Sequence, residues 1–318
     1  MPVQKVFRNP ISFFRNLFEK EGGFVDVARV NTKPYSIATS IEKIINIPKI
    51  RVPKGWAPNL SVPLDNALPF AWPEKYIALN HSFNPFCFYS NAISLRNYYL
   101  ATKDSKTLEL MKKLFQRFLE YSEVHDGARF VMYRFRKNYR KIPVAVPWTS
   151  AYASGAALIG LNVTHECIPT IGADKIAKEI LAGMGQVIDP RKHRPRFWVS
   201  FVDPKNYLWF EEKPLDQAEQ PRILNGHIRA LTGLYVHWFY NRDEHSQLLL
   251  RAGIATMEKY APEYRVAGSI NAYDLMKPVW VDYGPERTVD QQNILYEMTG
   301  EDVFRRYRDM FAEDIAKE

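Results

Sequence analysis

The sequence predicts a mainly α-helical protein, an α/α toroid in the form of an incomplete barrel of helical hairpins, with a short β-containing N-terminal arm and β-hairpin loops. Four similar segments follow one another after residue 84, and each has an apolar helix, a short polar break and an amphipathic helix. Long loops at 122–146, 188–222 and 261–287 separate these segments. A simple helical bundle would have much shorter loops, so the pattern favours the toroid.

The four segments begin at Asn84, Pro147, Ile223 and Thr288. KDS, NRDE and TGED are the polar breaks expected to separate the two helices of a hairpin. The first helix of each segment carries few charges, which predicts burial on most sides and an inner position. The second helix of the first segment shows the spacing of an amphipathic outer helix, with apolar side chains at Leu108, Met111, Leu114, Phe115, Phe118 and Leu119.

The residues before the repeats have a different character. Prolines at 48, 53, 58, 63, 69 and 73 exclude a long helix there, and PKIRVP and NLSVPL suggest short strands or extended loops. We therefore expect two parts: residues 1–80, an amphipathic helix followed by an extended or β arm, and residues 81–318, the toroid. The amphipathic segment places Phe7, Ile11, Phe14 and Phe18 near helical spacing, with basic residues between them.

Composition limits the class of protein and of partner. The chain has 318 residues, 43 Lys and Arg against 35 Asp and Glu, and a formal charge of +8. A hydrophobic fraction of 46% excludes a disordered or collagen-like chain. The charge favours an acidic partner, and aromatic residues at 14% can supply both a core and the lining of a wet cleft.

Localisation follows from two expected absences. The sequence shows no apolar run of about 18 residues and no secretory signal, so we expect a cytoplasmic protein. Residues 1–20 pack on the main domain or contact an anionic membrane surface as a peripheral helix, and the sequence leaves both open. It also leaves a homodimer open. Cys87 and Cys167 are too few for a disulfide framework and are expected to be free thiols.

The loops between the repeats carry the candidate chemistry. Alternation in residues 193–214 predicts a β-hairpin that turns at Asp203–Asn206 and ends in the motif LWFEEKP. ILNG with LTGLY follows, then AYDL, then VDYG with TVDQQ, and PWTSA lies upstream. In this order and spacing, the set resembles the C-terminal catalytic domain of glucuronyl C5-epimerases of the heparosan type, over roughly residues 80–300. The resemblance implies an α/α toroid, in agreement with the repeats.

The resemblance also implies site residues. Glu212 matches the glutamate of the family motif EEYP, and Lys213 stands where the family has a tyrosine. Asn225 matches the LNG asparagine, while Tyr273 and Tyr283 match two further tyrosines. Met276 stands where the YDLR motif has an arginine.

C5 epimerisation removes the proton beside a carboxylate, so a base and an acid must lie on opposite faces of the sugar. We expect Lys213, Tyr273, Tyr283 and Glu212 to form the catalytic group. A lysine can act as a base where burial favours its neutral form, so Lys213 is chemically acceptable in place of tyrosine. Substrate binding is assigned to Asn225, Arg222, His227, Trp209 and Trp148.

The expected activity is C5 epimerisation of D-glucuronate to L-iduronate, or a close variant, in an acidic polysaccharide. A polysaccharide lyase forms the same carbanion and is the nearest alternative, and a relative that only binds acidic glycan is the second. We expect no cofactor and no metal, because the sequence lacks a phosphate-binding loop, a dinucleotide motif and metal-ligand spacing. The basic run 134–141 can bind polysaccharide anions as well as phosphates, and no nucleic-acid motif accompanies it, so nucleic acid is not expected.

Overall fold

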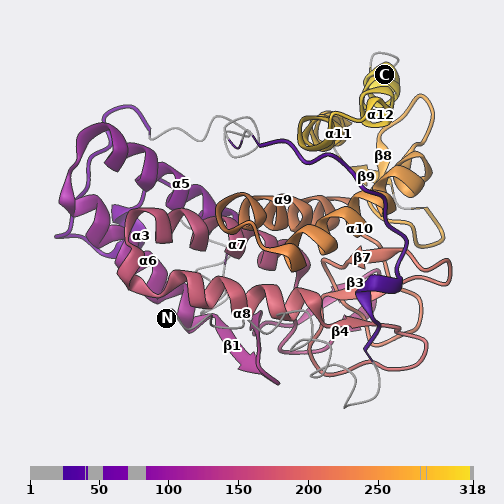
Figure 1. Ribbon diagram of the computed structural model, residues 1–318, viewed down its shortest axis with the longest axis horizontal. Coiled ribbons are helices and arrows are strands. Elements are labelled where there is room, and N and C mark those ends of the chain that lie inside the picture. The colour runs from indigo at the N-terminus through magenta and orange to yellow at the C-terminus, as the bar shows by residue number, and fades with distance from the viewer. Residues whose placement is uncertain are drawn as a thin grey trace, which may run out of the picture.

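Four helical hairpins follow one another in the computed structural model (Figure 1). The structure describes residues 24–39, 41, 53–70, 84–279, 281–283 and 285–315, with the side chains of 281–283 and 285 left out. The helices pair in chain order as α5 (Pro85–Thr102) with α6 (Ser105–Glu120), α7 (Ala151–Cys167) with α8 (Ala173–Gly185), α9 (Leu224–Asn241) with α10 (Glu244–Tyr260), and α11 (Pro285–Thr299) with α12 (Asp302–Ile315). The predicted repeat of four hairpins is confirmed.

Two of the polar breaks have the same construction. Lys103 ends α5 and Arg242 ends α9 in the left-handed conformation, with φ of 58° and 52°. The next residue in each case is an aspartate, Asp104 or Asp243, whose carboxylate accepts a hydrogen bond from the first turn of the following helix. A C-cap and an N-cap in adjacent positions therefore turn the chain through each hairpin.

The inner helices form a row in which α7 packs between α5 and α9, and each outer helix packs on its own inner partner. Small residues permit the close approach of α7 and α9. A Cβ atom added to Gly155 would lie 2.3 Å from the carbonyl oxygen of Arg229, and one added to Gly233 would lie 2.4 Å from that of Gly155. Since α11 also contacts α9, the inner helices curve into an incomplete α/α toroid, as predicted.

Most of the short strands gather at one end of the helices, whereas the first ribbon lies along α8 (Figure 1). Three two-stranded ribbons pair β1 (Ser122–His125) with β2 (Ala128–Val131), β3 (Lys137–Tyr139) with β4 (Ile142–Val144), and β8 (Asn271–Ala272) with β9 (Val281–Tyr283). A three-stranded sheet has β5 (Val187–Ile188) parallel to β6 (Ser200–Val202), and β6 antiparallel to β7 (Leu208–Phe210). The β6–β7 hairpin turns where predicted, because the carboxylate of Asp203 accepts hydrogen bonds from the backbone of Lys205 and Tyr207.

The described part of the N-terminal arm runs across the toroid. Val25 donates a backbone hydrogen bond to Val187 in β5, and Ala38 donates one to Met298 near the end of α11. A single turn, η1 (Val27–Arg29), interrupts this extended path, and further 3-10 turns occur at η2 (Pro169–Ile171) and η3 (Ala261–Tyr264). The predicted amphipathic segment 1–20 lies outside the described residues.

Of the strand and the extended loop suggested for NLSVPL, the structure has the loop. Residues 59–63 form turns, and α3 (Leu64–Ala67) begins directly after Pro63. The side chain of Asn59 accepts a hydrogen bond from the backbone of Ser61, which closes a local turn instead of a strand pairing. Most of PKIRVP lies outside the described residues.

Candidate functional site

The loop after β7 is held by a buried carboxylate. Glu211 is fully buried and accepts hydrogen bonds from the backbone nitrogens of Lys213, at 3.1 Å, and Arg222, at 2.6 Å. Its own carbonyl accepts from Ala151 at the start of α7. Burial raises the pKa of Glu211 to about 8, against the opposing effect of the two backbone donors. The carboxylate of Glu211 thus holds both ends of the loop 211–222, which fixes the position of the next residue, Glu212.

Glu212, Lys213 and Tyr273 form the centre of the candidate site. The ammonium of Lys213 donates to the phenol oxygen of Tyr273 at 2.8 Å, and Tyr273 donates to Oε1 of Glu212 at 3.2 Å. Lys213 Nζ also lies 3.3 Å from the same Glu212 oxygen. The side chains of Lys213 and Glu212 are only 7% and 15% exposed, so a cation and an anion share a nearly closed space with a phenol.

Backbone contacts bring Tyr273 to this loop across the sequence. Leu224 donates to the carbonyl of Tyr273, and Leu275 donates to that of Pro221. The segment after β8 therefore lies along the segment that leads into α9. Three of the residues that the sequence assigned to catalysis meet as a result.

A second tyrosine, Tyr139 at the end of β3, lies beside the same lysine. Lys213 Nζ is 4.8 Å from the ring centre of Tyr139 and 4.8 Å from that of Tyr273. The Tyr139 hydroxyl donates to Asp274, whose other oxygen lies 2.9 Å from the guanidinium of Arg140. Burial and the Asp274 carboxylate raise the pKa of Tyr139. Sequence reasoning gave no role to Tyr139 or Asp274. Tyr139 lies in the basic run 134–141, which predicts a surface for anions, and Asp274 lies next to Tyr273 in the AYDL motif.

The LNG motif acts through its glycine. A Cβ atom added to Gly226 would lie 2.4 Å from Cβ of Glu212, so only glycine lets the EEKP loop rest on the first turn of α9. Asn225, the residue before it, is partly exposed, and its Oδ1 has no hydrogen-bond partner among the described residues. The motif therefore positions Glu212 and leaves the amide oxygen of Asn225 available.

Three residues assigned to substrate binding pack in the core, and one tyrosine assigned to catalysis has its side chain outside the described part. His227 is fully buried, with one ring nitrogen 3.1 Å from the backbone nitrogen of Phe210 and the other 3.0 Å from the carbonyl of Gly253. Trp209 is fully buried, and Trp148 stacks on Tyr133 at 4.1 Å. These three side chains pack in the core, and the structure does not bring them to Lys213. The backbone register places Tyr283 opposite Asn271, while its side chain lies outside the described part.

Arg222 lies beside an aromatic ring, and the basic loop 191–196 is partly neutralised by ion pairs. Arg222 has a left-handed backbone, with φ of 58°, and its guanidinium lies 5.9 Å from the ring centre of Trp209. In the loop 191–196, Arg191 pairs with Asp189 and Arg194 with Asp216. Much of this local positive charge is therefore balanced within the protein.

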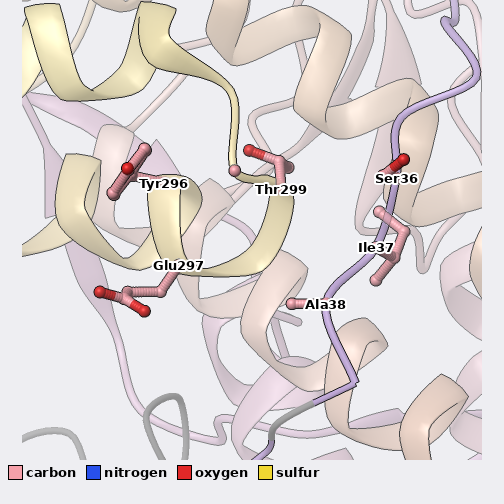
Figure 2. Close-up of a pocket in the computed structure, with 7 residues that line it drawn as sticks. Ser36, Ile37, Ala38, Tyr296, Glu297 and Thr299 are labelled. Carbon is pink, nitrogen blue, oxygen red and sulfur yellow. The ribbon is translucent and has the colours of Figure 1, made fainter.

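Two hollows of similar size lie elsewhere among the described residues, one between α3 and α6 and the other beside the N-terminal arm. A space of about 350 Å³ is lined by Ser36, Ile37 and Ala38 of the arm on one side and by Tyr296, Glu297, Thr299 and Gly300 on the other (Figure 2). It holds no acid–base pair comparable with Lys213 and Tyr273. Within the described ranges, no group of three or more His, Cys, Asp or Glu side chains is arranged to hold a metal ion. None of the described helices has the length and apolar character needed to cross a bilayer.

Comparison with known proteins agrees with this geometry. Residues 196–313 match the family described as D-glucuronyl C5-epimerase C-terminus, which confirms the resemblance predicted from the motifs. The matched segment contains Glu212, Lys213, Asn225 and Tyr273. No curated protein matches the chain.

Among solved structures, the chain is similar to the crystal structure of an unsaturated glucuronyl hydrolase from Streptococcus agalactiae, with a TM-score of 0.49 and 14% sequence identity. The similarity covers 77% of this chain and 61% of that one. The chain therefore spans less than two thirds of the length of the hydrolase.

Proposed function

We propose that this protein is a polysaccharide uronate C5-epimerase that converts D-glucuronate residues to L-iduronate or a close variant. One observation carries the proposal. The buried group of Lys213, Tyr273 and Glu212 lies within the segment that matches the D-glucuronyl C5-epimerase C-terminus. Two groups that carry protons and one that accepts them are the requirements of proton transfer at carbon.

The reaction breaks the C5–H bond and makes it again on the opposite face. A base takes the proton, and the electron pair of the bond passes into the adjacent carboxylate to give an enediolate. An acid then returns a proton to C5 from the other side, which restores the carboxylate and inverts the centre. No atom is gained or lost, so the sugar chain stays intact.

In the proposed mechanism, Lys213 and Tyr273 serve one face of the sugar. Tyr273 can pass its hydroxyl proton to Glu212 along their 3.2 Å hydrogen bond, and the phenolate that remains, stabilised by the Lys213 ammonium at 2.8 Å, takes the C5 proton. Glu212 accepts from Tyr273 and stays close to Lys213, which keeps both side chains in place. We assign the opposite face to Tyr283, in line with the sequence.

The proposed substrate is a polymer rich in glucuronate, of which heparosan is the first choice. The formal charge of +8 favours an acidic chain, and Asn225 and Arg222 lie at the two ends of the segment that leads into α9. The substrate would therefore pass over the end of the toroid where the short strands gather.

The test is hydrogen exchange in heavy water. The protein is incubated with heparosan, and the product is examined for deuterium at C5 and for new chain ends. Deuterium at C5 with an unbroken chain is the expected result. Unsaturated ends that absorb in the ultraviolet would instead identify a lyase. Absence of both exchange and cleavage on heparosan, hyaluronan and chondroitin would reject the proposal.

A further inference from the structure

The inner helices α7 and α9 are buried from their first residue to near their C-terminal ends, except at a few positions in the N-terminal half. From Ala151 to Thr164, α7 is fully buried apart from Tyr152, and from Leu224 to Trp238, α9 is fully buried apart from Asn225 and Arg229. Because neighbouring inner helices run in the same direction through the repeat, these three residues lie at one end of the toroid. Asn225 and Arg229 are one turn apart and share one face of α9.

Arg229 is held between two aromatic rings from the other inner helices. Its guanidinium carbon lies 4.5 Å from the ring centre of Tyr89 in α5 and 5.5 Å from that of Tyr152 in α7. The Glu212 backbone and Cβ lie against Gly226 in the first turn of α9, three residues before Arg229, and both charged groups act electrostatically on the Tyr152 hydroxyl. The guanidinium is thus fixed in orientation and partly exposed beside the candidate catalytic residues.

Three buried polar atoms around Arg229 have no hydrogen-bond partner among the described residues. They are the hydroxyl of Tyr89, which is 1% exposed, Oδ1 of Asn225 and Oε2 of Glu212. Buried polar atoms normally find partners, since leaving them unpaired costs free energy. The set contains one donor that can serve an anion, Tyr89, and two acceptors that can serve hydroxyl groups.

The arrangement of donors and acceptors specifies a ligand class. Arg229 and the Tyr89 hydroxyl can bind a carboxylate, whereas Glu212 and Asn225 can accept hydrogen bonds from hydroxyl groups. Two cations, Lys213 and Arg229, flank the single carboxylate of Glu212, and the N-terminal ends of α7 and α9 add partial positive charge. A sugar that carries a carboxylate and hydroxyls on one ring meets these requirements.

We propose that Arg229, Tyr89 and Asn225 form a binding subsite for a uronate residue of the polysaccharide, with Arg229 holding its carboxylate. This inference deepens the proposed function and rests on it for the substrate class. The subsite lies on the inner helices, on the side of Glu212 that faces Tyr152. It selects a sugar ring that carries a carboxylate, either the ring whose C5 proton is exchanged or the ring next to it.

The test measures binding without turnover. Octasaccharides of heparosan are compared with the same octasaccharides whose carboxyl groups have been reduced to hydroxymethyl groups. Arg229→Gln should weaken binding of the carboxylated ligand by about 10- to 100-fold, the range of a hydrogen bond to a charged group, and leave the reduced ligand unchanged. Tyr89→Phe, which removes only the hydroxyl, should weaken the same ligand by about 3- to 10-fold.

The matched control is Arg242→Gln. Arg242 lies at the other end of α9, and its guanidinium also stacks on two rings, 4.6 Å from Trp238 and 5.2 Å from Phe239. This variant should bind both ligands as the unmodified protein does. If Arg229→Gln does not fold, as judged by its melting temperature, Arg229→Lys and Tyr89→Phe carry the test.

Several outcomes would overturn the subsite. They are equal weakening of both ligands, no weakening of either, or Arg229-dependent binding of a carboxyl-reduced, N-sulfated octasaccharide, which would identify a sulfate site instead. The subsite would also be rejected if the unmodified protein showed no preference for carboxylated over reduced octasaccharides of heparosan, hyaluronan and chondroitin. Selective binding of the carboxylated ligand without C5 exchange would retain the subsite and reject the epimerase activity. C5 exchange at a rate that Arg229→Gln leaves unchanged would retain the epimerase activity and reject the subsite.

Discussion

The ammonium of Lys213 donates a 2.8 Å hydrogen bond to the phenol oxygen of Tyr273, 60 residues further along the chain. Each group changes what the other can do. A buried ammonium requires an acceptor, and the phenol oxygen supplies one while it still donates to Glu212. Because the two side chains act as one proton-carrying unit, removing either should have nearly the same consequence as removing both.

The first prediction concerns this unit. Lys213→Ala and Tyr273→Phe should each lower the rate of deuterium incorporation at C5 by about 10²-fold or more, the scale of a lost acid or base. The double variant should be only slightly slower than either single variant, because groups that act together are not additive. Lys205→Ala is the control, since Lys205 is exposed and lies over a different ring, that of Tyr260. Additive losses in the double variant would contradict the shared role.

The second prediction separates the ring of Tyr139 from its hydroxyl. Tyr139→Phe keeps the ring beside Lys213 and removes the hydrogen bond to Asp274, whereas Tyr139→Leu removes both. We expect a loss of rate of about fivefold for phenylalanine and a further loss of about fivefold for leucine, in line with a buried cation–π contact of about 1 kcal/mol. Equal rates in the two variants would show that the ring contributes nothing to Lys213.

Local physics explains why the helices could be predicted from the sequence. Two hairpin breaks contain their own caps, Lys103 with Asp104 and Arg242 with Asp243, so these breaks can be recognised without knowledge of the fold. The β6–β7 hairpin is equally local because Asp203 closes its own turn. NLSVPL was open between strand and loop, and it forms a loop because no neighbouring strand pairs with it among the described residues.

The site could be predicted only where motifs lie close to it in sequence. Glu212, Lys213 and Tyr273 follow from their motifs, and Asp274 and Arg229 lie one and four residues after motif residues. Tyr139 reaches Lys213 only through tertiary packing that no spacing encodes. His227 illustrates the opposite case, a residue close to a motif in sequence whose side chain lies in the core and not at the site. It lies two residues after Asn225, and on a helix that separation turns the side chain to the opposite face, toward the core.

The third prediction tests how Gly226 positions Glu212. Alanine normally favours a helix over glycine by about 1 kcal/mol, but a Cβ atom here would lie 2.4 Å from Cβ of Glu212 and must displace it. Gly226→Ala should therefore lower the exchange rate by about 10-fold or more. Gly253→Ala is the matched control, because its Cβ would lie 2.4 Å from the side chain of Leu231 in the core. At a similar loss of melting temperature, Gly253→Ala should retain more activity, and equal activities would contradict the positioning role.

The fourth prediction is a maximum of stability near pH 6.5. Burial lowers the pKa of His227 and His237 to about 4, below the ordinary value of 6.5. The unfolded chain therefore binds more protons than the folded protein between pH 6.5 and 4, and stability is lost as the pH falls through this window. Burial raises the pKa of Glu211 from 4.5 to about 8, so its contribution has the opposite sign and is lost as the pH rises from 4.5 to 8.

Between pH 4.5 and 6.5 the two histidines outweigh the single carboxyl group, and above pH 6.5 only Glu211 still titrates among these three. The free energy of unfolding should fall on both sides of pH 6.5, by about 2 kcal/mol between pH 6.5 and 8. Urea unfolding measured at half-unit steps from pH 4.5 to 8.5 tests this. Glu211→Gln should abolish the alkaline fall and make the acid side steeper, because the two histidines are then unopposed, whereas His237→Gln should flatten the acid side alone. An alkaline fall that persists in Glu211→Gln would mean that the buried carboxyl group is already ionised in the folded protein at neutral pH.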